Sequence, residues 1–327
     1  MLPVTPRPPV HRPHHPLRVL TWHVHGNYLL YLAQCGHEIV LPVGGEGGYA
    51  GRSPGFDWPD NVREVPAERI ADERLDVVLF QNVQNWRRDQ HVTLSWEQRA
   101  LPRVYVEHDP PRRHPTDTQH PVDDLNVLLV HVTHFNRLMW DAGRTPTTVI
   151  EHGVLVPPGV HATHELERGV VVMNGMDWRG RRVGRDVFEA LGADLPLDLI
   201  GMGSETIGGL GPISPDRLLP AMARYRFFFH PARYTSLGLA VLEAMSIGLP
   251  IVGLATTELP TVVDDGVTGF VSNDLDVLRD RMGLLLADRD LVTRMGDAAR
   301  RTALERFGIE RFARDWDRVL TAVVARA

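Results

Sequence analysis

Residues 230–245, HPARYTSLGLAVLEAM, join the end of a predicted strand to the start of a helix through a tight turn. Gly238 lets the backbone approach a ligand closely, and the N–H groups at a helix start attract phosphate. This geometry suits a diphosphate. Glu243 follows further along the helix among apolar residues, where an unpaired carboxylate would be costly. We therefore expect it to have a partner, such as a pair of ribose hydroxyls.

Histidines gather directly after the predicted strands, at the edge where open parallel sheets bind ligands. They are His23, His25, His108, His131 and His152. Zinc binding is one interpretation, but neither H-E-x-x-H nor paired C-x-x-C occurs, so we expect no metal. Hydrogen bonding in a polar cleft explains most of these histidines equally well. His108 is the one that we select as catalytic, because a strand end and a Pro-Pro turn fix the backbone beside it.

Two short basic clusters, at 112–113 and 179–182, could bind a small phosphorylated ligand. A solvated surface explains such clusters at least as often, and both interpretations stay open here. With a net charge of −6 and a pI near 6.2, the whole protein does not favour nucleic acid or an anionic membrane surface.

The elements that must position these residues alternate between short β-rich runs and helical patterns, which is typical of parallel α/β architecture. In the first half we predict one doubly wound domain. Its strands are expected at 17–22, 38–43, 76–80, 103–107, 125–130 and 148–150, with a helix at 27–34.

Residues 153–169 interrupt the alternation with prolines, glycines and polar residues, as an interdomain linker would. The second half repeats the plan of the first. We predict strands at 170–173, 197–201, 226–230 and 250–254, and helices at 185–191, 237–247 and after Ser214. The last helix, at 309–323, has a continuous apolar face and must pack against another part of the protein.

The length of 327 residues favours two domains, and the hydrophobic content of 43% is that of a globular protein. The single Cys35 excludes an intramolecular disulfide, and no run reaches the roughly 18 apolar residues of a membrane span. A cytoplasmic location is the simplest interpretation. The proline-rich residues 1–16 lack the apolar core of a signal peptide and are expected to be a flexible lead-in.

Taken together, these motifs resemble the retaining GT-B glycosyltransferases of family four, also called glycosyl transferases group 1. The segment SLGLAVLEAMSIGLPIV followed by ELPTVVDDGVTGF is similar to the family's G-F-G-x-x-x-x-E-A-M, G-x-P-V-V and P-E-x-V-x-D-G-x-T-G, with equal spacing. Weaker matches fall in the same order along the chain: GHEIVLP, VYVEHD, VIEHGV and ERFARDWDRVL.

The resemblance implies a GT-B fold, in which two Rossmann-like doubly wound α/β domains face a cleft and the C-terminal helix packs back toward the N-terminal domain. The implied parts are an acceptor-side domain at 17–160, a nucleotide-sugar-binding domain at 161–308 and a C-terminal helix at 309–327. It implies catalytic roles for His108, Arg179 and Arg182, and acceptor-side roles for His25 and Gly26. The implied donor-binding residues are Thr235, Ser236, Leu237, Gly238, Leu239 and Glu243.

By the same resemblance the protein is a hexosyltransferase-type enzyme of carbohydrate biosynthesis. It would move a sugar from a UDP-, GDP- or ADP-sugar to a carbohydrate or other hydroxyl acceptor, with retention and without a metal or further cofactor. The arginines and the helix start would stabilise the leaving diphosphate, which could itself take the acceptor proton. Acceptor recognition would fall to the loops at 44–58, 81–93 and 110–124.

Three departures from the family pattern keep other functions open. Thr235 occupies the position of a glutamate that normally contacts the donor sugar, Thr257-Glu258 replaces Gly-Gly, and Thr261 replaces the next glutamate. A non-catalytic nucleotide-sugar or carbohydrate-binding protein is one alternative. Another GT-B enzyme, such as a sugar-nucleotide epimerase, is a second. A dehydrogenase is disfavoured because no G-x-G-x-x-G follows the first strand of either domain.

Overall fold

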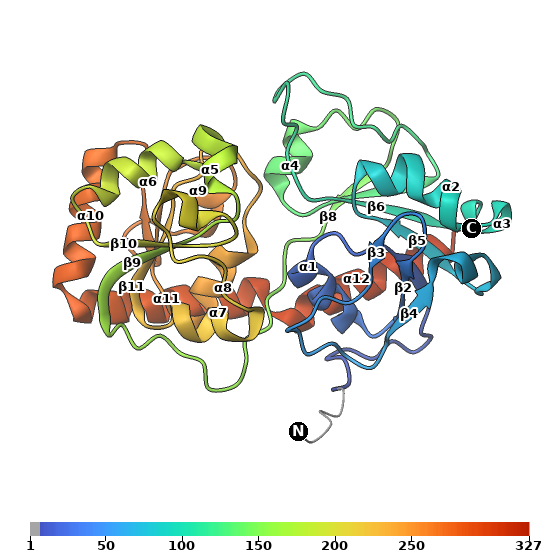
Figure 1. Ribbon diagram of the computed structural model, residues 1–327, viewed down its shortest axis with the longest axis horizontal. Helices are drawn as coiled ribbons and strands as arrows, with labels where there is room; N and C mark the ends of the chain where they lie inside the picture. The colour runs from blue at the N-terminus through green and yellow to red at the C-terminus, as the bar shows by residue number, and fades with distance from the viewer. Residues whose placement is uncertain (1–6, 327) are drawn as a thin grey trace. The chain divides into compact units, whose positions relative to one another are not determined.

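The computed structural model describes residues 7–326, and the chain divides into two compact units (Figure 1). Unit 1 contains the residues up to Gly153 together with those from Ile309 onward, and unit 2 contains Val154–Gly308. The first division therefore falls at Gly153, whereas the sequence had led us to expect it at residue 160. The C-terminal helix belongs to unit 1.

Unit 1 is built on a mostly parallel sheet of hydrophobic strands. Its order is β3-β2-β1-β5-β6-β7-β8, and β4 also pairs with β2. The strands are β1 (Arg18–Thr21), β2 (Glu38–Gly44), β3 (Tyr49–Ala50), β4 (Val62–Pro66), β5 (Val77–Phe80), β6 (Arg103–Glu107), β7 (Val127–His131) and β8 (Thr147–Val149). Only β3 is antiparallel to its neighbour among the described strands of this sheet. The parallel register brings the carboxyl ends of β6, β7 and β8 to one edge.

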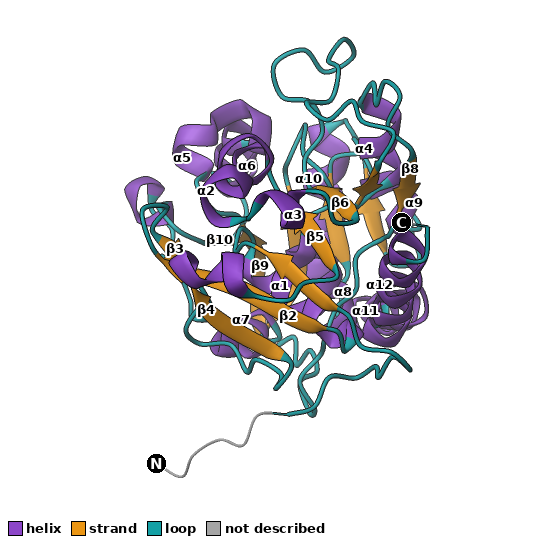
Figure 2. Ribbon diagram, turned by 90° about the vertical axis from the view of Figure 1, so that its right-hand side faces the viewer, coloured by secondary structure: helices purple, strands orange, loops and turns teal. Residues whose placement is uncertain are grey.

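The helices of unit 1 are short except for the last one. They are α1 (Gly26–Leu32), α2 (Gln90–Thr93), α3 (Trp96–Arg99), α4 (His134–Met139) and α12 (Ile309–Val324). Helix α12 contacts α1 and β6, and Phe312, Trp316 and Leu320 on its apolar face are fully buried, whereas Val319 and Val323 are half-buried. The apolar stripe predicted from the sequence therefore packs within unit 1, and the course of α12 can be followed in Figure 2.

Residues 1–16 were expected to be a flexible lead-in, but the part of this segment that the structure describes is held by hydrogen bonds. Residues 1–6 lie outside the described residues. The N–H of His11 donates to the carbonyl of Gln34 at 3.1 Å, and His11 Nε2 lies 2.7 Å from a carboxylate oxygen of Asp317 on α12. Gly36, with φ of +77°, receives the His11 carbonyl so closely that a Cβ there would lie 2.2 Å from that oxygen. These contacts, between residues far apart in the sequence, hold the segment around His11 on unit 1.

Unit 2 has a fully parallel sheet in the order β10-β9-β11-β12-β13. The strands are β9 (Leu166–Val172), β10 (Leu197–Ile200), β11 (Tyr225–His230), β12 (Ile251–Gly253) and β13 (Gly269–Val271). The helices are α5 (Met176–Arg179), α6 (Arg185–Gly192), α7 (Pro215–Met222), α8 (Leu239–Ile247), α9 (Leu259–Val262), α10 (Leu275–Ala287) and α11 (Arg289–Phe307). Strand β9 begins at Leu166, inside the segment expected to be a linker.

Both faces of the unit 2 sheet are covered. Phe227 and Phe229 of β11 lie in one core cluster with Val187 of α6 and Leu278 of α10, whereas Phe228, which points the other way, is also buried. Strands buried on both faces read as continuous apolar runs, which is why YRFFFH was predicted as a strand. In such a sheet the loops after the strands are left to bind ligands.

Candidate functional site

The loops that follow β9, β11 and β12 lie together at the carboxyl edge of the unit 2 sheet. The N–H groups of Arg233 and Tyr234 donate to the carbonyl of Arg182, at 3.0 and 3.1 Å, and join the loop after β11 to the turn after α5. Thr256 Oγ1 donates to the carbonyl of Ala232 at 3.1 Å and joins the loop after β12 to the same segment. Three loops that are distant in sequence are thereby held at one place.

Helix α8 begins at Leu239, two residues later than the sequence predicted, and Gly238 is its N-cap in extended conformation. Because glycine has no side chain, the N–H groups of the first turn receive no cap from it, and the positive end of the helix dipole is exposed to a ligand. Ser236 and Leu237 are buried, and Thr235 is half-buried beside them. The five consecutive predicted donor-site residues therefore lie together at this helix start.

Arg179 and Arg182 lie in the turn after β9, both half-buried. Arg179 Nη1 donates to the carbonyl of Asn174 at 3.1 Å, so its guanidinium stays at the end of β9. A third arginine, Arg233, was not singled out in the sequence. It forms a bidentate ion pair with Asp186 of α6, at 2.5 and 2.8 Å, and this pair fixes the loop after β11 on its other side.

Glu243 is 3% exposed on α8, among the apolar residues that surround it in the sequence. A second carboxylate, that of Glu258 in the neighbouring loop, was not predicted as a site residue from the sequence. Glu258, also 3% exposed, accepts a hydrogen bond from Thr261 Oγ1 at 3.0 Å. The residue before it, Thr257, has φ of +54°, which is strained for a β-branched residue and is accepted readily only by glycine. The sequence feature that could have drawn attention to Glu258 is the replacement of the family's Gly-Gly by Thr257-Glu258.

In unit 1, the predicted catalytic His108 follows β6 and lies in an aromatic cluster. Its ring centroid is 4.5 Å from that of His25 and 4.6 Å from that of Tyr28, both at edge-to-face angles. His108 Nε2 is buried and has no hydrogen-bond partner among the described residues. Loss of solvation, and then the nearby imidazoles of His25 and His152, hold the pKa of His108 well below its usual value. The imidazole is therefore neutral at physiological pH.

Gly26, the other predicted acceptor-side residue, begins α1 and lies against Phe56 from the glycine-rich loop at 44–58. A Cβ at Gly26 would lie 3.1 Å from the Phe56 ring. His23 supports the same loop, since its Nε2 is 3.0 Å from Ser53 Oγ. His25, Gly26 and this loop therefore form one surface next to His108 in unit 1.

The returning helix α12 supports this cluster from below. Tyr28 makes an edge-to-face contact with Phe312 at 5.7 Å, and Phe312 lies so close to Gly153 that a Cβ on that residue would be 2.3 Å away. Burial raises the pKa of Tyr28 far above its usual value, so its hydroxyl stays protonated. Tyr28 therefore packs against His108 as a buried, uncharged ring.

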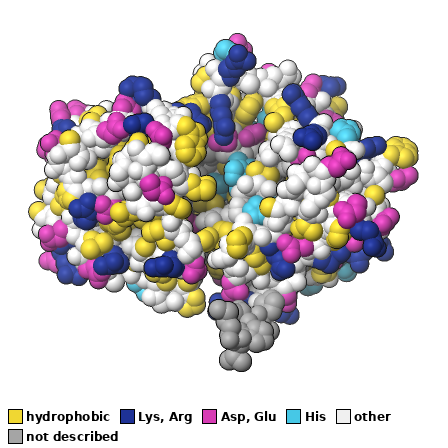
Figure 3. Space-filling model, viewed as in Figure 1, with side chains coloured by type: hydrophobic (Ala, Val, Ile, Leu, Met, Phe, Trp, Pro, Cys, Tyr) yellow, Lys and Arg dark blue, Asp and Glu magenta, His cyan; other side chains and the backbone are white. Residues whose placement is uncertain are grey.

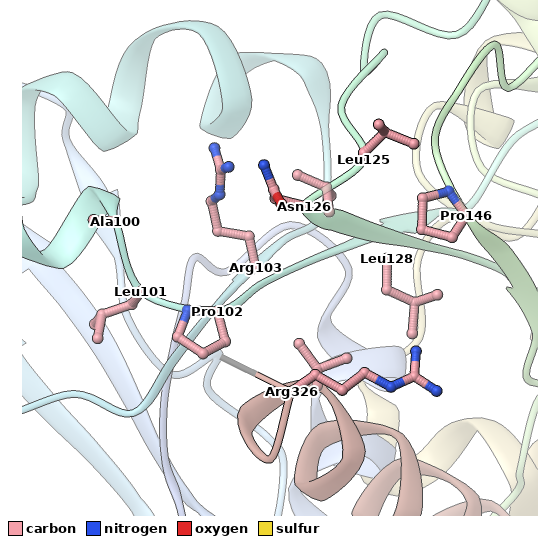
Figure 4. A pocket seen from close by; sticks show the side chains of 11 residues that line it. Ala100, Leu101, Pro102, Arg103, Leu125, Asn126, Leu128, Pro146 and Arg326 are labelled. Atoms are coloured by element: carbon pink, nitrogen blue, oxygen red, sulfur yellow. The ribbon is translucent and has the colours of Figure 1, made fainter.

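A pocket of about 470 Å³ lies elsewhere in unit 1, among residues that precede β6, β7 and β8 and residues of the α12 end (Figure 4). Its lining includes Arg103, Leu125, Leu128, Pro146 and Arg326. No predicted site residue lines it, and it lies at the amino ends of the strands. Ligands of open parallel sheets bind at the opposite ends.

Acidic and basic side chains are interspersed over the face shown in Figure 3. Within residues 7–326, no group of three or more His, Cys, Asp or Glu side chains is arranged to hold a metal ion. No helix in the described part of the chain combines the length and the apolar character needed to cross a membrane.

Residues 204–302, within unit 2, match the family model of glycosyl transferases group 1. The match includes α8, Glu243 and the loop with Glu258. The predicted resemblance to glycosyl transferases group 1 is therefore confirmed over this segment.

Three curated relatives match the chain over short segments. Sulfoquinovosyl transferase SQD2 of Arabidopsis thaliana is 37% identical over 28% of this chain and 19% of its own length. The N-acetyl-alpha-D-glucosaminyl L-malate synthase of Bacillus anthracis is 33% identical over 26% of this chain and 23% of its own. The D-inositol 3-phosphate glycosyltransferase of Nocardia farcinica is 34% identical over 28% and 21%. The alignments thus span about a fifth of the length of these relatives.

The solved structures extend the likeness to almost the whole chain. Sucrose-phosphate synthase from Thermosynechococcus elongatus has a TM-score of 0.64 at 15% identity, over 95% of this chain and all of its own. HepE from Anabaena, in complex with UDP and glucose, has a TM-score of 0.68 at 14% identity, over 94% of this chain and all of its own. At such identities the likeness concerns the fold, and the predicted GT-B class with two Rossmann-like domains is confirmed.

Proposed function

We propose that the protein transfers a sugar from a nucleoside diphosphate sugar to an acceptor hydroxyl, with retention at the anomeric carbon. One observation carries the proposal. The glycine-capped start of α8 and the buried Glu243 lie on one helix within the part of the chain that matches the glycosyltransferase model, and the loop before this helix is hydrogen-bonded to the turn that carries Arg179 and Arg182. We infer that the N–H groups at this helix start, the positive charge of the arginines and the carboxylate of Glu243 serve a single ligand.

Each of these groups suits one part of the donor. The first turn of α8 and the backbone of Ser236–Leu239 would bind the diphosphate, and Glu243 would accept hydrogen bonds from the ribose hydroxyls. Arg179 and Arg182 would oppose the negative charge that develops as the nucleoside diphosphate leaves. Because these groups supply positive charge, we propose transfer without a metal ion.

Unit 1 would contribute the residues around the acceptor and the transferred sugar. His108 is neutral, so it can donate one hydrogen bond and accept another, and its Nε2 atom has no protein partner among the described residues. His25 and Gly26 border it in a region that the loop at 44–58 also reaches. We assign the acceptor hydroxyl to this surface, and we propose that the leaving phosphate takes its proton.

UDP is the first nucleotide to test, because the solved structure of HepE contains UDP and glucose. The proposed activity is tested by incubation with UDP-glucose, GDP-glucose and ADP-glucose, with water as the acceptor and a chelator present. Release of one nucleoside diphosphate, with α-glucose as the first sugar seen by NMR, supports retaining, metal-independent transfer. Initial release of β-glucose contradicts retention.

A second candidate function rests on Thr235, which stands where the family pattern has a glutamate that contacts the donor sugar. A non-catalytic nucleotide-sugar-binding protein would bind one of the three donors and release no nucleoside diphosphate. The same incubation, combined with a binding titration, therefore separates the two functions.

A further inference from the structure

The backbone of Asp109, the residue after His108, is held by side chains that bond to its N–H and to its carbonyl. Glu107, the last residue of β6, accepts at Oε1 a hydrogen bond from the Asp109 N–H at 2.9 Å. The Asp109 carbonyl accepts a hydrogen bond from Trp140 Nε1 at 2.8 Å. The residue that follows His108 is therefore held from the strand before it and from the segment after α4.

His120 holds the carboxylate that makes the first of these bonds. Its Nδ1 accepts a hydrogen bond from the Val122 N–H at 3.1 Å, so the proton of the neutral ring is on Nε2. Nε2 lies 3.1 Å from Glu107 Oε2 and donates to it. Both oxygens of Glu107 are thus engaged, and the carboxylate cannot rotate without losing a bond.

The ring of His120 is itself fixed by packing. Its side chain is fully buried, and it makes edge-to-face contacts with Tyr105 at 4.9 Å and with Trp140 at 5.0 Å. The same indole therefore packs against His120 and bonds to Asp109. Glu107, His120 and Trp140 form one connected unit, which we call the Asp109 clamp.

We propose that the Asp109 clamp is a positioning device that orients His108 for sugar transfer; this rests on the function proposed above. His108 is joined to the clamp on both sides, by the peptide from Glu107 and the peptide to Asp109. The Nε2 atom of its ring has no hydrogen-bond partner among the described residues, so the backbone and the contacts with His25 and Tyr28 set the direction of the ring. A displacement of about 1 Å in a reacting group can cost roughly 100-fold in rate, which gives such a clamp a function beyond stability.

Two substitutions remove separate parts of the clamp. Trp140→Phe keeps an aromatic ring but loses the N–H that bonds to Asp109. Glu107→Gln keeps the shape, but an amide has one acceptor oxygen, so one of the two donors loses its partner. Asn61→Ala is the matched control, because it removes hydrogen bonds from a side chain to the carbonyls of Ala33 and His37 elsewhere in unit 1.

The measurements are the kcat for release of UDP from UDP-glucose, the Kd for UDP, and the NMR titration of His108. For both clamp variants we expect kcat to fall about tenfold or more. Because unit 2 is proposed to hold the nucleotide, the Kd for UDP should stay within about twofold. The pKa of His108 should rise toward its usual value, since a loosened loop lets water reach the ring. Asn61→Ala should change only the melting temperature.

Folded Trp140→Phe and Glu107→Gln proteins with the wild-type kcat and the wild-type His108 titration would overturn the clamp. A loss of kcat with an equal loss of UDP affinity, shared by Asn61→Ala, would also overturn it, because that pattern indicates general destabilisation. If the wild type turns over none of UDP-, GDP- and ADP-glucose, the proposed function fails by itself. The His108 titration then still decides whether the clamp orients that ring.

Discussion

Gly184 lies against the carbonyl of Pro231, where the turn after β9 meets the loop after β11. A Cβ at this position would be 2.0 Å from the Pro231 oxygen, and the residue has φ of +81°. Real Cβ atoms almost never approach other atoms within 3.0 Å, so Gly184→Ala forces the two loops apart. We therefore predict that this single methyl group weakens both the stability of unit 2 and its affinity for a nucleotide.

The magnitude follows from two costs. A left-handed conformation costs a residue other than glycine about 1–2 kcal/mol, and overpacking typically costs about 1–3 kcal/mol. Together, the two costs lower the free energy of unfolding by about 2–5 kcal/mol. For a unit of this size, each kcal/mol corresponds to about 2–4 °C in melting temperature. A fall of at least about 4 °C in Tm is expected.

Thermal unfolding and a titration with UDP measure the two effects, and Gly192→Ala is the control. Gly192, at the end of α6 in the same unit, has no atom within 4 Å of an added Cβ, and its φ is not positive. It should be neutral or stabilising by up to about 1 kcal/mol, because alanine favours a helix. A Gly184→Ala protein with the Tm and UDP affinity of the wild type would refute the reasoning.

Three further predictions concern other parts of the protein. Burial lowers the pKa of His230 to about 4, so the unfolded chain binds its proton first, and stability should fall by roughly 3 kcal/mol as the pH drops from about 6.5 to 4. Urea unfolding at several pH values should show that the free energy of unfolding falls less steeply with decreasing pH in His230→Gln than in the wild type. The same pH dependence in both proteins would contradict this. Phe312→Ala should lower the free energy of unfolding by about 3–5 kcal/mol in the same urea assay, because the side chain is fully buried against Tyr28. An unchanged urea midpoint would disprove that this packing stabilises unit 1. Arg179→Gln with Arg182→Gln should weaken UDP binding tenfold or more, by about 1.4 kcal/mol or more, and reduce its salt dependence; unaltered calorimetry would remove them from the site.

Much of the fold was predictable because its strands are buried on both faces. The short, β-rich runs RVYVE and YRFFFH favour central strands, and β6 and β11 were placed within one residue. Strand β4 was missed because its sequence, VREVP, places two charged residues between valines and ends in proline. It becomes a strand through parallel pairing with β2, which local sequence does not encode.

The candidate site was partly predictable from local signals at the ends of strands and the starts of helices. His108 could be selected because a strand end and two prolines flank it, and Ser236–Leu239 because a helix was expected to begin there with Gly238 at its start, whereas Thr235 was named from the family resemblance. The contacts that hold these residues join distant segments. The Trp140–Asp109 bond spans 31 residues and the His11–Asp317 bond spans 306, so neither has a local signature. Glu258 was overlooked because its burial depends on the folded loop after β12.

Calorimetric titration of the intact chain with UDP, GDP and ADP tests the central claim most directly, with Glu243→Ala titrated in parallel. The account predicts that one nucleotide binds and that its affinity falls at least tenfold in the variant, because Glu243 is proposed to hold the ribose. No binding of any of the three nucleotides, or equal binding by the variant, would contradict the donor site proposed for unit 2.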